Sequence, residues 1–66
     1  MSQLYDLRML IENKIKSDGL DAMKVKGQIG LRSGRVLALI SPSTPDDPAA
    51  VGKLRQAVKD VLHVDA

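Results

Sequence analysis

Hydrophobic residues recur at every third or fourth position near the start of the chain, and this spacing predicts an amphipathic helix over residues 3–18. Ser2 is a typical N-cap residue, and Gly19 stands where a helix end favours left-handed backbone. Both ends of this helix are therefore marked in the sequence. Its hydrophobic stripe consists of Leu4, Leu7, Ile11 and Ile15.

In the middle of the chain the spacing changes to alternation, which predicts two β-strands. Hydrophobic and polar residues alternate over residues 23–31, whereas residues 36–41 are hydrophobic on both faces. Ser33-Gly34 lies between them and is a two-residue turn signal. We therefore expect an antiparallel hairpin that turns at Ser33-Gly34.

A proline-rich connector, residues 41–48, separates the predicted hairpin from a second helix. Its three prolines exclude a helix interior and a central strand. The helix is capped either by Thr44, with Pro45 following, or by one of the two aspartates directly before Pro48. We expect it to fray near His63. Its hydrophobic stripe is Val51, Leu54, Val58, Val61 and Leu62.

The order helix, strand, strand, helix predicts a single two-layer α+β domain over residues 1–66. A lone two-stranded hairpin is marginal in water, so both helices should pack on one face of it. The chain is 44% hydrophobic but has no cysteine for a disulfide, so we expect a homodimer, in which two hairpins can join into a four-stranded sheet. The predicted core is Leu4, Leu7, Ile11, Ile15, Val25, Ile29, Leu31, Val36, Ala38, Ile40, Val51, Leu54, Val58, Val61 and Leu62.

Charge is distributed unevenly, because no carboxylate occurs between Met23 and Pro45. On the predicted hairpin, the cations of this interval share the outer face with two leucines. A hydrophobic centre with a charged rim is typical of protein interfaces. The sequence therefore predicts a non-catalytic protein-interaction or adaptor module, whose partner is a second copy of the chain or another protein. The predicted partner-binding residues are Leu37, Leu39, Lys24, Lys26, Arg32 and Arg35.

Sequence-independent nucleic-acid binding is the alternative function. A row of cations can follow phosphates, and Gly27-Gln28-Ile29-Gly30 matches the GxxG string of KH domains, which clamps the nucleic-acid backbone. That string falls inside a predicted strand, however, where a bulge or a close backbone approach explains glycine. The predicted hairpin also lacks aromatic residues for base stacking. We therefore rank this function below protein binding.

The sequence shows no arrangement of catalytic or metal-binding residues. His63 is the only histidine, and Ser41, Ser43 and Thr44 suit turns and caps. We therefore expect no enzyme activity, no cofactor and no small-molecule substrate. No hydrophobic run approaches the roughly 20 residues of a membrane span, and the first residues lack the hydrophobic region of a signal peptide. A cytoplasmic location without membrane contact is expected.

Overall fold

The chain folds into three α-helices and one short 3₁₀ helix over the residues that the structure describes, which are 2–34 and 37–64 of the computed structural model. No strand occurs in this part of the chain. The predicted α+β fold, the hairpin turning at Ser33-Gly34 and the four-stranded sheet are therefore wrong. The elements are α1 (Gln3–Asp18), α2 (Ala22–Ser33), η1 (Leu37–Leu39) and α3 (Pro48–Leu62).

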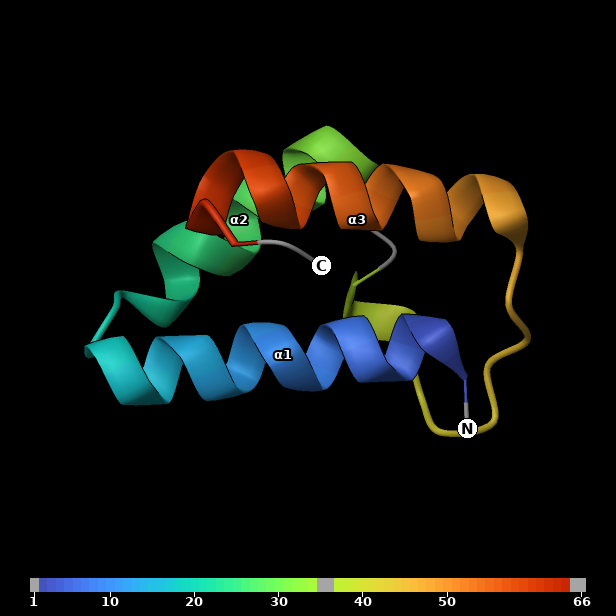
Figure 1. Cartoon of the computed structure of the whole chain (residues 1–66), viewed down its shortest axis with the longest axis horizontal. Helices are drawn as coiled ribbons and strands as arrows, with labels where there is room; N and C mark the ends of the chain where they lie inside the picture. The colour runs from blue at the N-terminus through green and yellow to red at the C-terminus, as the bar shows by residue number, and fades with distance from the viewer. Residues whose placement is uncertain (1, 35–36, 65–66) are drawn as a thin grey trace.

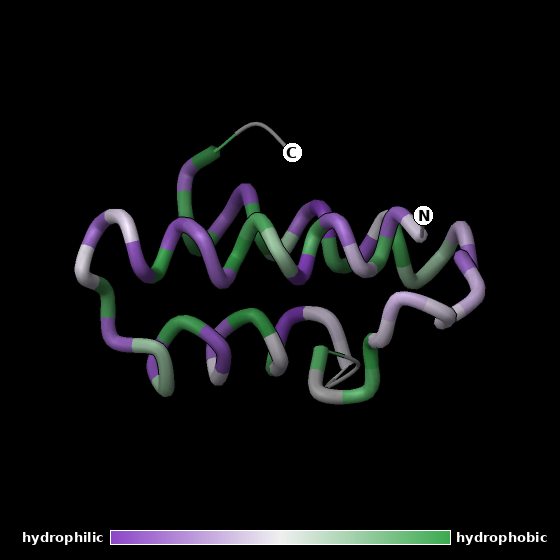
Figure 2. The backbone as a smooth tube through the Cα atoms, turned by 90° about the horizontal axis from the view of Figure 1, so that it is seen from below, coloured by the Kyte–Doolittle hydropathy of each residue, from purple (hydrophilic) through white to green (hydrophobic). Residues whose placement is uncertain are grey.

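The helices form two layers. In Figure 1, α1 and α3 run in the same direction, and α2 returns behind α3. The view from below in Figure 2 shows α2 and η1 as a second layer next to α1 and α3. The packed molecule is 30 Å long and about 20 Å across. None of the helices in residues 2–34 and 37–64 is long and apolar enough to cross a membrane.

Helix α1 has the predicted bounds, and both predicted caps are confirmed. The Ser2 hydroxyl accepts the backbone N–H of Tyr5 at 2.9 Å. Gly19 has a left-handed backbone with φ of 62°, and its N–H donates to the Ile15 carbonyl. The next residue, Leu20, also donates its N–H to Ile15, at 3.0 Å. Polar groups left over at both helix ends are thus satisfied locally.

Helix α2 occupies the segment that was predicted as the first strand and the turn. Its N-cap is Asp21, whose carboxylate accepts the Lys24 N–H at 3.2 Å, and its C-cap is Gly34, with φ of 79°. A glycine with positive φ suits a hairpin turn and a helix end equally well. Gly34 was therefore predicted to form a turn, whereas it ends α2. Val25 and Ile29 are four residues apart and share one helix face, which packs inward. Ile29 is fully buried and Val25 is half-buried.

Most of the residues that were predicted to form the core are buried in it. Val25 and Val61 are only partly buried at its edge. Leu31 was predicted to be buried, but it is 70% exposed because it lies on the opposite side of α2 from Ile29. Val36 and the side chain of Ala38 lie outside the described part. The confirmed core residues are Leu4, Leu7, Ile11, Ile15, Ile29, Ile40, Val51, Leu54, Val58 and Leu62, and the prediction missed Leu37 and Ala57.

The segment predicted as the second strand forms η1 and a turn. The Arg8 guanidinium on α1 donates to the Ile40 carbonyl at 2.6 Å, and Ile40 itself is buried. Ser41 donates its N–H to the Thr44 hydroxyl at 2.7 Å, so Thr44 closes this turn and does not cap α3. Asp47 caps α3, directly before Pro48, which was one of the two predicted alternatives. The connector thus ends where its sequence indicates.

Asp46 fastens the connector to the start of α1. Its carboxylate accepts the backbone N–H groups of Gln3 and Leu4 at 2.9 and 3.1 Å. These two hydrogen bonds hold the pKa of Asp46 below its ordinary value. A residue distant in sequence therefore satisfies free amides at the positive end of α1, and α1 is fixed next to the start of α3.

Candidate partner-binding surface

The solvent-facing side of α2 carries large hydrophobic side chains that the chain does not cover. Met23 is 86% exposed and Leu31 is 70% exposed. They lie eight residues apart, with Gly27 midway, so the three share one face of the helix. Gly30 lies beside Gly27 at the edge of this face. We call Met23, Gly27, Gly30 and Leu31 the outer stripe.

An open groove of about 760 Å³ runs beside the outer stripe, between α2, α1 and η1. Its hydrophobic lining comes from the outer stripe and from Leu37 of η1, and its charged lining comes from α1 and α2. The groove is open to solvent, so its shape suits a protein segment laid along it better than an enclosed small molecule. The lining residues are Arg8, Glu12, Met23, Lys24, Lys26, Gly27, Gln28, Gly30, Leu31 and Leu37.

One ion pair crosses the groove. The Lys26 ammonium lies 2.7 Å from the Glu12 carboxylate and joins α2 to α1. The hydrogen bond from Lys26 holds the pKa of Glu12 below its ordinary value, and the charges of Lys26, Arg8 and Lys16 act in the same direction. Glu12 is therefore ionised at neutral pH and engaged with Lys26.

The lining as a whole carries an excess of positive charge. It contains three cations (Arg8, Lys24, Lys26) and one carboxylate (Glu12), which leaves a net charge of +2 at the groove. Lys24 is exposed and makes no ion pair within residues 2–34 and 37–64. Arg8 is fixed by its bond to the Ile40 carbonyl but has no carboxylate partner in this part of the chain.

The two glycines of the outer stripe have no packing role within the described chain. A Cβ atom added to Gly27 or Gly30 would have no atom within 4 Å apart from the adjoining residues and backbone of α2 itself, and neither residue has positive φ. Both lie inside α2. The GxxG string therefore does not join two helices as in KH domains, and neither a bulge nor a close backbone approach accounts for it.

The predicted partner-binding residues do not share one face. Leu37 is buried in the core, whereas Leu39 is 80% exposed on η1. Lys24 and Lys26 both line the groove, but Arg32 lies 3.9 Å from Asp60 of α3, outside it. Arg35 lies outside the described residues. The single row of cations predicted for a hairpin face is therefore wrong, because that row required a strand.

Met23, Leu31, Arg8 and Glu12 were missed as site residues. Asp21 and Gly34 bracket a helix of twelve residues, and these caps were the signal that could have revealed the site. On such a helix the hydrophobic residues at positions 23 and 31 fall opposite Ile29 and must face outward.

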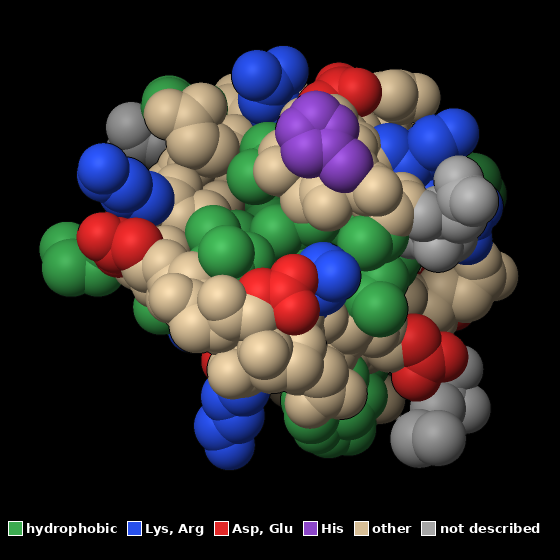
Figure 3. All heavy atoms as spheres, turned by 60° about the vertical axis from the view of Figure 1, so that its left-hand side comes forward, with side chains coloured by type: hydrophobic (Ala, Val, Ile, Leu, Met, Phe, Trp, Pro, Cys, Tyr) green, Lys and Arg blue, Asp and Glu red, His purple; other side chains and the backbone are tan. Residues whose placement is uncertain are grey.

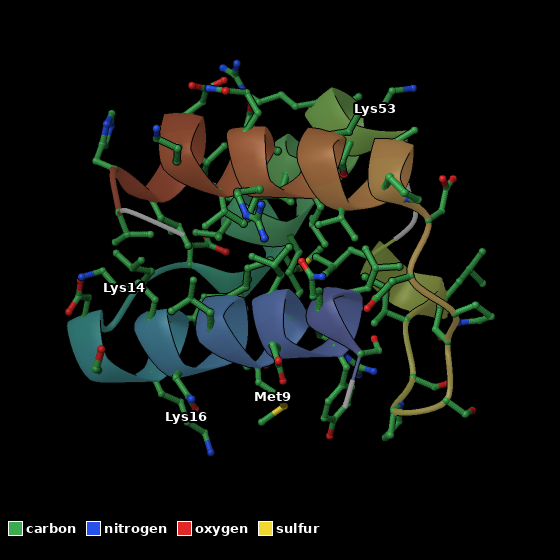
Figure 4. All side chains as sticks on the ribbon, turned by 45° about the vertical axis from the view of Figure 1, so that its right-hand side comes forward. Met9, Lys14, Lys16 and Lys53 are labelled. Atoms are coloured by element: carbon green, nitrogen blue, oxygen red, sulfur yellow. The ribbon has the colours of Figure 1, made fainter. Side chains whose placement is uncertain are left out.

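Other faces of the molecule also expose hydrophobic side chains, among them Leu39, Met9 and Leu20. Figure 3 shows the end of the molecule where α2 begins and α3 ends, with hydrophobic side chains exposed among charged ones. In Figure 4, Met9 and Lys16 point away from α3 on the outer side of α1, and Lys53 points outward from α3. Met9 is 39% exposed and does not line the groove, so it provides a comparison for Met23.

Comparison of the chain with protein-family models, curated proteins and solved structures gives no match. The fold and the groove therefore carry the functional argument by themselves.

Proposed function

We propose that this chain is a non-catalytic protein-interaction module that binds a partner through the outer stripe of α2 and the groove beside it. The observation that carries the proposal is the exposure of Met23 and Leu31 on one face of a helix whose other face is in the core. Contiguous exposed hydrophobic surface rimmed by polar residues is typical of interaction sites. The proposed location remains the cytoplasm.

The chemistry of the groove supports binding more than catalysis. Among the described residues, Glu12 is the only carboxylate of the lining and is engaged with Lys26, and no histidine, serine or threonine lines the groove. General bases and nucleophiles come mostly from these residue types and from lysine, tyrosine and cysteine. Of the last three types, only Lys24 and Lys26 line the groove among the described residues, and Lys26 is paired with Glu12. We therefore keep the proposal that the protein is not an enzyme.

Nucleic-acid binding remains the alternative, with less support. Lys26 and Arg32 each face a carboxylate of the chain, Glu12 and Asp60, so two of the predicted phosphate-binding cations are already partly compensated. No aromatic side chain on which a base could stack lines the groove in the part of the chain that the structure describes. Its exposed hydrophobic residues also have no counterpart in a phosphate backbone.

The homodimer remains a prediction with a narrower basis. One reason to expect a second copy was that the predicted second strand, residues 36–41, is hydrophobic on both faces, but that strand does not form and Leu37 is buried within its own chain. The absence of cysteine still leaves the small core without a covalent crosslink. Sedimentation equilibrium at micromolar concentration measures the association state directly.

Site-specific photocrosslinking tests the proposed function. A photoreactive amino acid is placed at position 23 or 31 in the full chain, and at position 9 as the control on the other side of α1. We expect a discrete protein adduct from positions 23 and 31 and none from position 9. The adduct partner, once purified, should bind the wild-type chain and lose affinity for the double variant Met23→Gln/Leu31→Gln. Equal crosslinking at all three positions, or unchanged affinity of the double variant, contradicts the proposal.

A further inference from the structure

We infer that the partner segment is an acidic amphipathic helix, which lies along α2 with its hydrophobic stripe on Met23 and Leu31 and its carboxylates beside Lys24 and Lys26. This inference rests on the proposed function and specifies the chemistry of the partner. Two independent properties of the groove point to such a segment, the spacing of its exposed hydrophobic side chains and its charge.

The spacing of the hydrophobic side chains suits a helix. Met23 and Leu31 are eight residues apart, so they lie about 12 Å from each other along the axis of α2. On a partner helix, residues separated by seven or eight positions span the same distance on one face. Between these anchors, Gly27 and Gly30 leave the backbone of α2 uncovered, with open space where side chains would be. A second helix can therefore approach α2 closely.

The cations flank the hydrophobic floor on both sides. At about 100° per residue, Lys24 and Lys26 project about 160° apart around α2, with Met23, Gly27 and Leu31 between them. Arg8 adds a third cation from α1, and Glu12 offsets one of the three. A partner helix with carboxylates on both edges of its hydrophobic stripe complements this arrangement. A partner with cations there would be repelled.

A second copy fits the groove less well. Pairing α2 with α2 of another copy would bring together two sets of Lys24 and Lys26, and α2 itself contains no carboxylate to offset them. Among the described lining residues, each copy would supply one carboxylate, Glu12 of α1, which is already engaged with Lys26. Charge therefore favours an acidic segment of another protein.

The test uses the full chain and three synthetic helical peptides of about four turns, which share one leucine stripe and differ only in the flanking residues: glutamate, glutamine or lysine. Affinities are measured by isothermal titration calorimetry at low and high salt. We expect the glutamate peptide to bind about tenfold or more tighter than the lysine peptide at low salt, with a smaller difference at high salt. Amide NMR shifts should cluster on α2, Arg8 and Glu12. Lys24→Glu should remove the preference, and Lys53→Glu, on the outer side of α3, should retain it.

The outcomes separate the inference from the proposed function. If all three peptides bind equally and Met23→Gln/Leu31→Gln weakens each, the acidic class is wrong and the interaction surface stands. If none binds, the inference fails, while crosslinking still decides the proposed function. A dimer in sedimentation equilibrium that this double variant dissociates would make a second copy the occupant and overturn the inference. If labelled DNA or RNA binds more tightly than the glutamate peptide, and Lys24→Glu abolishes that binding, both the inference and the proposed function are overturned.

Discussion

The Lys26 ammonium lies 2.7 Å from the Glu12 carboxylate, and this ion pair joins α2 to α1 across the groove. Both side chains are partly exposed, at 43% and 35%, so solvent screens the attraction and its effect on stability is small. The pair nevertheless sets the position of Lys26 on one side of the outer stripe and neutralises Glu12, the one carboxylate among the described residues of the groove lining. Arg8 and Lys24 are then the lining cations that no carboxylate among the described residues offsets.

The Glu12–Lys26 pair should make stability depend on pH in the acid range. Because the folded pKa of Glu12 lies below its ordinary value of 4.5, the pair stabilises the folded state above that pH and loses this effect as pH falls through the folded pKa. Glu12→Gln should therefore lower the melting temperature slightly at neutral pH, and the difference from wild type should vanish in strong acid. Thermal unfolding of both proteins from neutral pH down to strong acid measures it. A constant difference over this range contradicts the assignment.

The Asp46 carboxylate should be required for a firm start of α1. Asp46→Ala removes the acceptor of the Gln3 and Leu4 N–H groups, so the melting temperature should fall by several degrees and both amides should exchange faster with solvent. Circular dichroism and hydrogen exchange measure the two effects. Asp6→Asn, in the same first turn, serves as control because it leaves these hydrogen bonds in place. Equal exchange in Asp46→Ala and wild type would show that the contact does not form.

Gly27→Ala should increase stability and weaken partner binding. Alanine favours a helix over glycine by up to about 1 kcal/mol, and the added Cβ meets no atom within the described chain. The same methyl group would hold a partner helix away from α2. Gly52→Ala on α3 is the matched control, because its Cβ also enters open space and Gly52 does not line the groove. Urea unfolding and peptide titration should show both variants stabilised and only Gly27→Ala impaired in binding. Equal binding by the two variants contradicts a close helix approach.

Ile29 and Leu31 distinguish the helical fold from a hairpin. A strand would place both residues on the same buried face, whereas α2 buries Ile29 and exposes Leu31. Ile29→Ala should cost about 2–4 kcal/mol of unfolding free energy, and Leu31→Ala less than about 0.5 kcal/mol. Chemical denaturation measures both. Comparable losses for the two variants would favour the hairpin.

The sequence predicts α1 and α3 correctly because no other secondary structure fits their hydrophobic patterns. In α1, Ser2 and Gly19 lie at the two ends of a stripe with helical spacing, and in α3, Asp47 and Pro48 mark the start of another. For α2 the pattern is ambiguous, since residues 23, 25, 27, 29 and 31 alternate as in a strand only if Gly27 is counted as hydrophobic. A glycine fits either face, so it gave the alternation false support.

The candidate partner-binding surface lies on this ambiguous segment, so most of its geometry was not predictable. Lys24 and Lys26 were predicted as partner-binding residues from their charge and from a shared face of the hairpin. Both line the groove although that hairpin does not form. Met23 was placed on the inner face, and Leu31 in the core, because the strand pattern put both beside Ile29. Leu37 was expected to face a partner and is buried instead, because η1 turns it toward the core.

The central claim is that the outer stripe of α2 binds a protein segment, and the most direct measurement is the affinity of the glutamate-flanked peptide for two variants. Met23→Gln/Leu31→Gln removes two exposed anchors, and burial of such a side chain contributes about 1.5–3 kcal/mol. The affinity of this double variant for the peptide should fall by about tenfold or more. The Met9→Gln variant, changed on the outer side of α1, should bind the peptide like the wild type. Equal affinity of the double variant and wild type, with both folded, would contradict the claim.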